Sequence, residues 1–196
     1  MKKVLTLRNV IVWAGALLLL VAFFLSFGAK MSIIMDGVQF SYNGIVWGSN
    51  SVTMGGVTVP VSKMEIGVDK LLPSGALLVG VILMLVASIA AVVIGLLVKK
   101  PWAKWVVLGC AAVAITGAIM QFVAKDSFAH AYVNTLMKAE GITDKAAIDE
   151  AFKQFRYSMD QYGAKVTLPI VSGVLGLIGA LAIGGAQFLP EKELLK

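Results

Sequence analysis

Cysteine, histidine and charged residues are all scarce in this sequence, and each shortage excludes a class of function. Cys110 is the single cysteine, so an intrachain disulfide, a CxxC redox centre and a cysteine-based zinc site are all excluded. His130 is the single histidine, which excludes any site that needs two imidazoles. Only 14% of the 196 residues are charged and 59% are hydrophobic, whereas soluble domains carry about 25% charged residues. The composition therefore indicates an integral membrane protein of one domain.

Four apolar stretches are long enough to cross a bilayer, whose hydrocarbon core of about 30 Å requires about 20 helical residues. They cover, approximately, residues 9–28, 72–98, 102–124 and 166–189. The first has a basic start, as a signal peptide does, but its apolar run exceeds the roughly 7 to 15 residues of a signal core, so we expect a retained span. We predict a membrane α-helical protein: one tetraspan domain over residues 1–196, with a four-helix transmembrane bundle and outer segments at 29–71 and 125–165.

Lysine and arginine are distributed unevenly among the segments that connect these stretches. The two chain ends and the 99–104 turn hold eight basic and two acidic residues, whereas the two outer segments together hold nine of each. Basic residues of short loops mark the cytoplasmic side. We therefore expect a multi-pass protein of the plasma membrane with cytoplasmic N- and C-termini. No basic cluster is large enough to bind nucleic acid, and the basic face is expected to meet the lipid bilayer.

The first outer segment has the periodicity of β-strands. Apolar and polar residues alternate over residues 38–43, and Asn43-Gly44, a strong hairpin signal, follows. Further short apolar runs between turn residues lie at 45–47, 52–54 and 57–59. We predict an extracytoplasmic antiparallel β-meander of about four strands, with one apolar face anchored by Phe40, Tyr42 and Trp47.

The second outer segment has the periodicity of helices. Phe128 and Tyr132, four residues apart, indicate that the third apolar helix continues outward. Thr143 or Asp144 can cap a new helix, and residues 145–162 place apolar side chains in steps of three and four. We predict a helical hairpin that covers the apolar face of the sheet.

Small residues recur at every fourth position of the last apolar stretch: Ser172, Gly176, Ala180 and Gly184. This spacing places them on one helix face, where small side chains let neighbouring helices approach closely. The stripe indicates close packing within the bundle or, alternatively, an interface with another chain. No Asp, Glu or His lies in any of the four stretches, which weighs against a proton- or ion-coupled transporter made from one chain.

Few side chains in the outer segments are candidates for metal chemistry. His130 would need Asp126 or Met137 as a second ligand, and Met31 with Met35 could offer thioethers to Cu(I). Surface exposure or packing is the more common role of such residues. We therefore predict neither a metal site nor a cofactor.

If the protein were an enzyme, its candidate catalytic side chains would be carboxylates. A membrane enzyme would require a cluster at the membrane boundary, formed by Asp126 with Asp160 or Glu65. Asp36 and Asp69 are expected to be solvated charges. Because the sequence contains neither a catalytic triad nor a nucleotide-binding loop, we expect a protein that is not an enzyme.

The order of spans and outer segments resembles the claudin-like tetraspan family. Gly44-Ile45-Val46-Trp47 is similar to that family's Gly-Leu-Trp motif in the first outer segment, with one additional residue. The resemblance implies cytoplasmic ends, a strand-rich first outer segment and a third helix that projects beyond the membrane. The two cysteines that follow the family's motif have no counterpart here, so its disulfide is not expected.

These patterns together predict a non-enzymatic tetraspan that acts as a structural, interaction or accessory protein through its extracytoplasmic domain. Its partner would be another membrane protein or a second copy of the chain. The candidate interface residues are Phe40, Tyr42, Trp47, Ser172, Gly176, Ala180 and Gly184. Two alternatives stay open: a channel-forming oligomer or small subunit of a transporter complex, and a membrane enzyme that acts on lipid or an envelope precursor.

Overall fold

The computed structural model describes residues 6–64, 66–97 and 101–190. Several positions on which the predicted orientation depends, such as Lys99 and Lys192, lie outside the described residues, as does Glu65. The contacts divide the chain into two compact units. The first comprises Met1–Phe24, Val79–Gln121 and Val171–Lys196, and the second comprises Leu25–Leu78 and Phe122–Ile170.

Four helical segments in the described part of the chain are long and apolar enough to cross a membrane, as predicted. The third is longer than a bilayer requires, because α3 continues through a 3-10 turn (Gln121–Val123) into α4. The helices concerned are α1 (Leu7–Leu25), α2 (Gly75–Leu97), α3 (Ala103–Met120) with α4 (Ala124–Ala139), and α6 (Leu168–Ala186). These are the helices of a multi-pass membrane protein.

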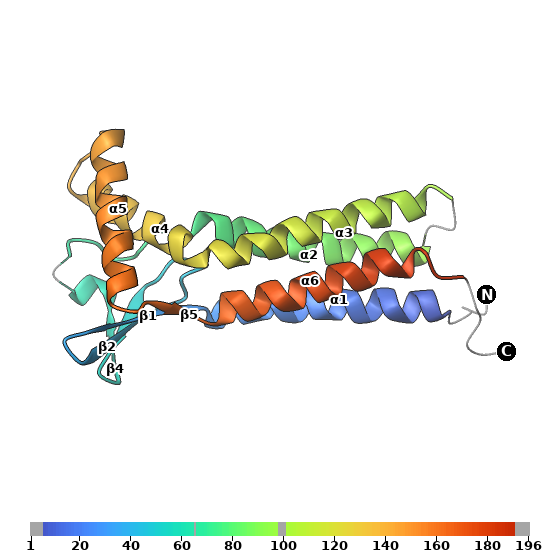
Figure 1. The fold of residues 1–196 in the computed structure, drawn as a ribbon, viewed down its shortest axis with the longest axis horizontal. Coiled ribbons are helices and arrows are strands. Elements are labelled where there is room, and N and C mark those ends of the chain that lie inside the picture. Colours follow the sequence, from blue (N-terminus) through green and yellow to red (C-terminus); the bar gives the residue numbers. More distant parts are fainter. Residues whose placement is uncertain (1–5, 65, 98–100, 191–196) are drawn as a thin grey trace. The chain divides into compact units, whose positions relative to one another are not determined.

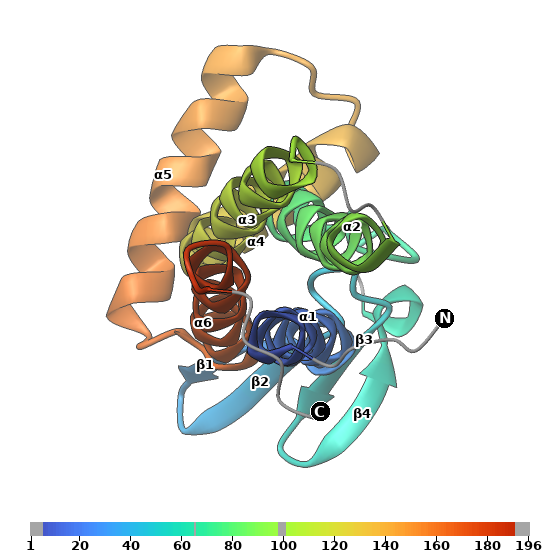
Figure 2. The same ribbon diagram turned by 90° about the vertical axis from the view of Figure 1, so that its right-hand side faces the viewer.

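In the first unit, α1, α2, α3 and α6 form a four-helix bundle, seen from the side in Figure 1 and along the helices in Figure 2. Pairs of glycines bring the helix backbones together. A Cβ built on Gly15 of α1 would lie 2.6 Å from the carbonyl oxygen of Gly179 in α6. A Cβ on Gly117 of α3 would lie 2.5 Å from the carbonyl oxygen of Gly80 in α2. The backbones are too close for any side chain at these positions.

Two buried serines link further helices of this bundle. The Ser88 hydroxyl in α2 donates to the Ala16 carbonyl of α1 at 3.0 Å. The Ser172 hydroxyl in α6 donates to the Ala22 carbonyl of α1 at 2.8 Å. Each bond gives a buried serine hydroxyl a partner and links α1 to a neighbouring helix.

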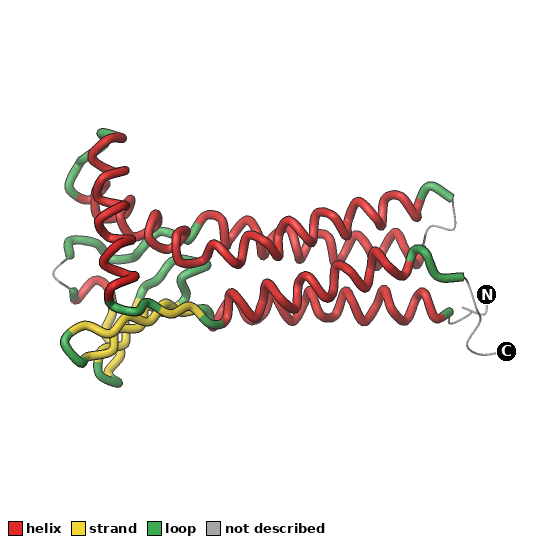
Figure 3. Tube along the Cα trace, viewed as in Figure 1, coloured by secondary structure: helices red, strands yellow, loops and turns green. Residues whose placement is uncertain are grey.

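The second unit contains an antiparallel sheet, drawn in yellow in Figure 3. A meander was predicted, and in the described residues it has five strands in the order β4-β3-β2-β1-β5. The strands are β1 (Lys30–Met35), β2 (Val38–Asn43), β3 (Ser51–Met54), β4 (Val57–Pro60) and β5 (Lys165–Val166). Strands β1 and β5 are additional to those predicted from the sequence.

The predicted hairpin at Asn43-Gly44 is wrong, and so is the predicted strand over residues 45–47. Strand β2 instead pairs back onto β1 through Asp36-Gly37, whose φ angles of 50° and 78° suit a type I′ turn. The amides of Gly44 and Ile45 both donate to the carbonyl of Ala29, which turns the chain away from the ladder. Residues 45–47 form a turn.

Helices α4 and α5 (Lys145–Gln161) form the predicted pair. Asp144 rather than Thr143 caps α5, because its carboxylate accepts the amide of Ala147 at 3.0 Å. Helix α4 covers the sheet through Phe128 and Tyr132, whose ring centroids lie 5.2 and 5.8 Å from that of Tyr42. Helix α5 then packs on α4.

Candidate functional site

One face of the sheet is apolar throughout. The strand register places alternate residues of each strand on the same face, because strand side chains alternate with period two. The members of this face in the four long strands are Met31, Ile33, Met35, Val38, Phe40, Tyr42, Val52, Met54, Val57 and Val59. To bury the whole of this face, another layer of the protein would have to extend along its full length.

Helix α4 covers only one end of this face. Met31, Tyr42 and Val52 are buried there, and so is Ile33, which pairs with Phe40 nearer the middle of the face. At the other end, beside the two hairpin turns, Met35, Val38 and Val57 are 39%, 42% and 66% exposed. Phe40 and Met54 are half-buried beside them. We call the set Met35, Val38, Phe40, Met54 and Val57 the apolar strip.

The opposite face of the sheet is mainly polar, although Ile34 on this face is 54% exposed, and several of its polar side chains bond to one another. The hydroxyls of Ser32 and Ser41 lie 2.9 Å apart. The Asn43 amide donates to Thr53 Oγ1 at 3.1 Å, and the Thr53 and Thr58 hydroxyls lie 3.0 Å apart. These bonds satisfy many of the hydrogen-bonding side chains on this face.

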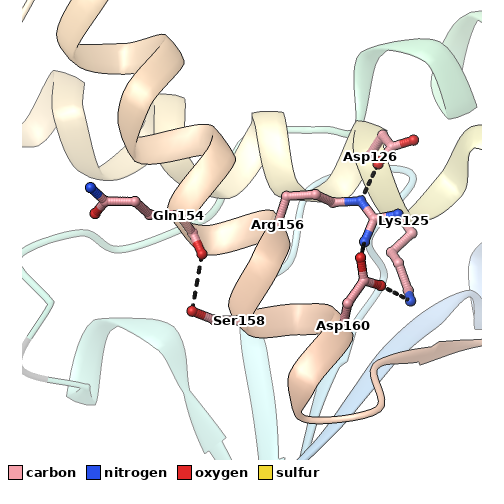
Figure 4. Close-up of polar contacts among 6 residues, drawn as sticks. All are labelled: Lys125, Asp126, Gln154, Arg156, Ser158 and Asp160. Atoms are coloured by element: carbon pink, nitrogen blue, oxygen red, sulfur yellow. Dashed lines mark hydrogen bonds and ion pairs between the residues drawn. The ribbon is translucent and has the colours of Figure 1, made fainter.

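Charged residues connect α4 to α5, as Figure 4 shows. The Arg156 guanidinium of α5 bonds to the carboxylates of both Asp126 and Asp160. Lys125 Nζ lies 2.8 Å from Asp160 Oδ1. The hydrogen bond from Arg156, followed by that from Lys125, lowers the pKa of Asp160 from 3.8 to about 2. Asp126 and Asp160, the carboxylates that an enzyme would need, therefore share one cation, and the pKa of Asp160 moves away from the range of a general acid.

His130 lies in a groove of about 410 Å³ within the second unit. One wall comes from the entry to α2 and the other from α4. The lining residues are Leu72, Pro73, Gly75, Ala76, Val123, Asp126, Ser127, His130, Ala131 and Asn134. The groove thus brings Asp126 and His130 together, but Met137 does not line it. The described residues contain no group of three His, Cys, Asp or Glu side chains that could hold a metal ion.

The small-residue stripe of α6 contacts other helices of the same chain. Ser172 and Ala180 are fully buried. A Cβ on Gly176 would lie 2.5 Å from Met84 Sδ, and one on Gly184 would lie 3.3 Å from Ala111 Cβ. The stripe serves packing within the bundle, which was one of the two predicted roles.

Two of the three predicted anchors of the outer sheet make contacts inside the second unit. Burial beneath α4 raises the pKa of the Tyr42 phenol, with a smaller contribution from the adjacent phenol of Tyr132. Trp47 Nε1 donates to Ser26 Oγ at 3.0 Å, and its ring stacks on Phe27 at 5.0 Å. Phe40 is the anchor that reaches the apolar strip.

Sequence reasoning missed several residues of these two surfaces. Met35 belongs to the strip, and the alternation of Met31, Ile33 and Met35 could have revealed it. Ser127 and Asn134 belong to the groove, and the step of four from His130 to Asn134 was a usable signal.

Comparisons with known proteins give no family assignment. No protein-family model matches the chain, and neither a curated protein nor a solved structure matches it. The function is therefore inferred from these surfaces alone.

Proposed function

We propose that the protein is a non-enzymatic tetraspan of the plasma membrane whose extracytoplasmic unit binds another protein of the membrane or envelope. In this proposal the basic chain ends are cytoplasmic, and the sheet with α4 and α5 lies outside. The observation that carries the proposal is the apolar strip at the turn end of the sheet.

The strip has the character of an association surface. Val57 is 66% exposed although it lies on the same face as the buried Val52. Contiguous exposed apolar side chains rimmed by polar ones mark surfaces that meet another protein. Two proteins confined to one membrane already have a high effective concentration, so a strip of five residues can contribute to specific association.

The second candidate function, a channel or transporter subunit, has less support. The small-residue stripe is the feature that suggests it. However, Ser172 and Gly176 of that stripe contact α1, α2 and α3 of the same chain, so they are not available to a second chain. The third, a membrane enzyme, would need Asp126 or Asp160 free of Arg156.

Photo-crosslinking in living cells tests the proposal directly. A benzophenone amino acid at position 57 is expected to crosslink the chain to a second protein. Thr58 provides the matched control, because it is exposed next to Val57 but lies on the opposite face of the sheet. Val57→Asp should abolish co-purification of the crosslinked protein, whereas Thr58→Asp should not.

The identity of the crosslinked product separates the outcomes. A product of specific mass other than twice that of the chain supports a different protein as partner. A product of twice the mass assigns the strip to self-association instead. Equal crosslinking from positions 57 and 58, or none from either, would refute the proposed role of the strip.

A further inference from the structure

The groove beside His130 has two chemically different walls. Asp126, His130 and Asn134 follow one another at intervals of four residues, so they share one face of α4. Ser127 adds a hydroxyl to the same wall. Leu72 and Pro73 are among the apolar residues that form the facing wall. A ligand that matches both walls must be amphiphilic.

The polar wall holds hydrogen-bonding groups that the described part of the protein does not satisfy. Ser127 is only 8% exposed, yet its hydroxyl has no hydrogen-bond partner among the described residues. The same holds for the side chains of His130 and Asn134. These groups are therefore available to bond to a molecule that enters the groove.

Helix α5 holds the two titratable groups of this wall in place. The ring of Phe152 stacks on that of His130, with centroids 3.7 Å apart and planes 8° apart. This contact fixes the imidazole plane and leaves its edge nitrogens available. Arg156 Nε bonds to Asp126 Oδ1, and Oδ2 has no partner within the described residues. The wall therefore presents one carboxylate and one imidazole in fixed positions, with the side chains of Ser127 and Asn134 beside them.

Several lining residues of the groove lie at the ends of helices that are long and apolar enough to cross a membrane. Gly75 and Ala76 are the first two residues of α2, and Val123 directly follows the span made by α3. The continuous helix Ala103–Ala139 has 37 residues, far more than the roughly 20 that a bilayer needs. If the apolar half, α3, makes the crossing, the charged half, α4, lies beyond the hydrocarbon, and the groove lies at the depth of lipid headgroups.

We propose that this groove binds the headgroup of a membrane phospholipid that carries a primary ammonium, as ethanolamine phospholipids do. The ammonium would donate to Asp126 Oδ2, and the phosphate would accept from Ser127, His130 and Asn134. The glycerol and the start of the acyl chains would lie against Leu72 and the other apolar lining residues. This inference is independent of the apolar strip and of any protein partner.

The lining distinguishes a primary ammonium from a trimethylammonium. A trimethylammonium has no N–H to donate to a carboxylate, and proteins recognise it with cages of aromatic rings. Among the described lining residues, His130 is the one aromatic ring, and Phe152 stacks against it. The groove should therefore prefer ethanolamine over choline headgroups on the same acyl chains.

Native mass spectrometry of the full-length, delipidated protein in detergent tests this preference. Phosphatidylethanolamine, phosphatidylcholine and phosphatidylglycerol with identical acyl chains are titrated separately. The dissociation constant is expected to be about tenfold lower for phosphatidylethanolamine than for phosphatidylcholine, the effect of one charge-assisted hydrogen bond. Phosphatidylglycerol, which lacks the ammonium, should bind no better than phosphatidylcholine.

Three variants separate ammonium recognition from phosphate recognition and from folding. Asp126→Asn should bring phosphatidylethanolamine to the level of phosphatidylcholine. Asn134→Leu, which touches no ion pair, should weaken all three lipids alike. The matched control is Asp149→Asn, because Asp149 is an exposed carboxylate of α5 that does not line the groove. It should leave the preference unchanged.

Three results would overturn the proposal. One is equal affinity of the unaltered protein for the ethanolamine and choline lipids. Another is retention of the preference in Asp126→Asn. The last is lipid binding by Asn134→Leu as strong as that of the unaltered protein. Circular dichroism is used to confirm that each variant has the helicity of the unaltered protein before its lipid binding is measured.

Discussion

Gly117→Ala should destabilise the bundle by about 1–2 kcal/mol. Its new Cβ would lie 2.5 Å from the Gly80 carbonyl oxygen, 3.1 Å from Leu83 Cβ and 3.1 Å from Met84 Cγ. Carbon–oxygen contacts between helices are about 3.3 Å or longer, so α2 and α3 must separate locally by about 0.8 Å. Overpacking of this kind costs about 1–3 kcal/mol. The greater helix propensity of alanine offsets about 0.5–1 kcal/mol of that cost.

Gly109→Ala in the same helix is the matched control. A Cβ on Gly109 would meet no heavy atom within 4 Å, so only the helix propensity changes. It should leave the free energy of unfolding unchanged or raise it by up to about 1 kcal/mol. Both variants are measured by titrating the purified protein with sodium dodecyl sulfate and following helicity. Equal stability of the two variants would refute the close glycine contact between α2 and α3.

Three further predictions concern the second unit. The pKa of Asp160 is lowered, so its stabilising contribution is complete above about pH 4 and is lost as the pH falls through about 2. The melting temperature of the unaltered protein should therefore exceed that of Asp160→Asn at pH 6, and the difference should shrink as the pH falls towards 2. Trp47→Phe keeps a ring on Phe27 but removes the bond to Ser26, and should lower the free energy of unfolding by about 0.5–1.5 kcal/mol in denaturant titrations. Gly37→Ala imposes a side chain at φ 78° in open space, and should cost about 1–2 kcal/mol in the same measurement through backbone strain alone.

The four apolar helices and the pair α4 and α5 could be predicted because their signals are local. An apolar run of about 20 residues, or a cap such as Asp144 before an amphipathic pattern, needs no knowledge of distant contacts. The stripe containing Gly176 likewise indicated a packing face, although it could not show which helices it would meet.

The strand pairing could not be predicted, because two hairpin signals of equal local strength compete. Asp36-Gly37 and Asn43-Gly44 are both favourable turn dipeptides. The choice depends on the Ala29 carbonyl, which accepts two amides just after Asn43 and diverts the chain. The apolar Ile45-Val46 has the composition of a strand, but it fills a buried turn.

The groove was also beyond sequence reasoning, because its walls come from segments about 50 residues apart in the chain. One side runs over 72–76 and the other over 123–134. His130 looked like an isolated imidazole in the sequence. Only the folded second unit shows that Ser127 and Asn134 open into the same space.

Membrane topology is the claim on which the proposed roles of the strip and the groove both depend. In a Cys110→Ala background, single cysteines at Thr143 and Trp102, both exposed in the structure, report on the two sides of the membrane. A membrane-impermeant maleimide should label Thr143→Cys in intact cells, and should label Trp102→Cys only after the membrane is permeabilised. Labelling of Trp102→Cys in intact cells, or protection of Thr143→Cys, would contradict the four-span topology with its basic face in the cytoplasm.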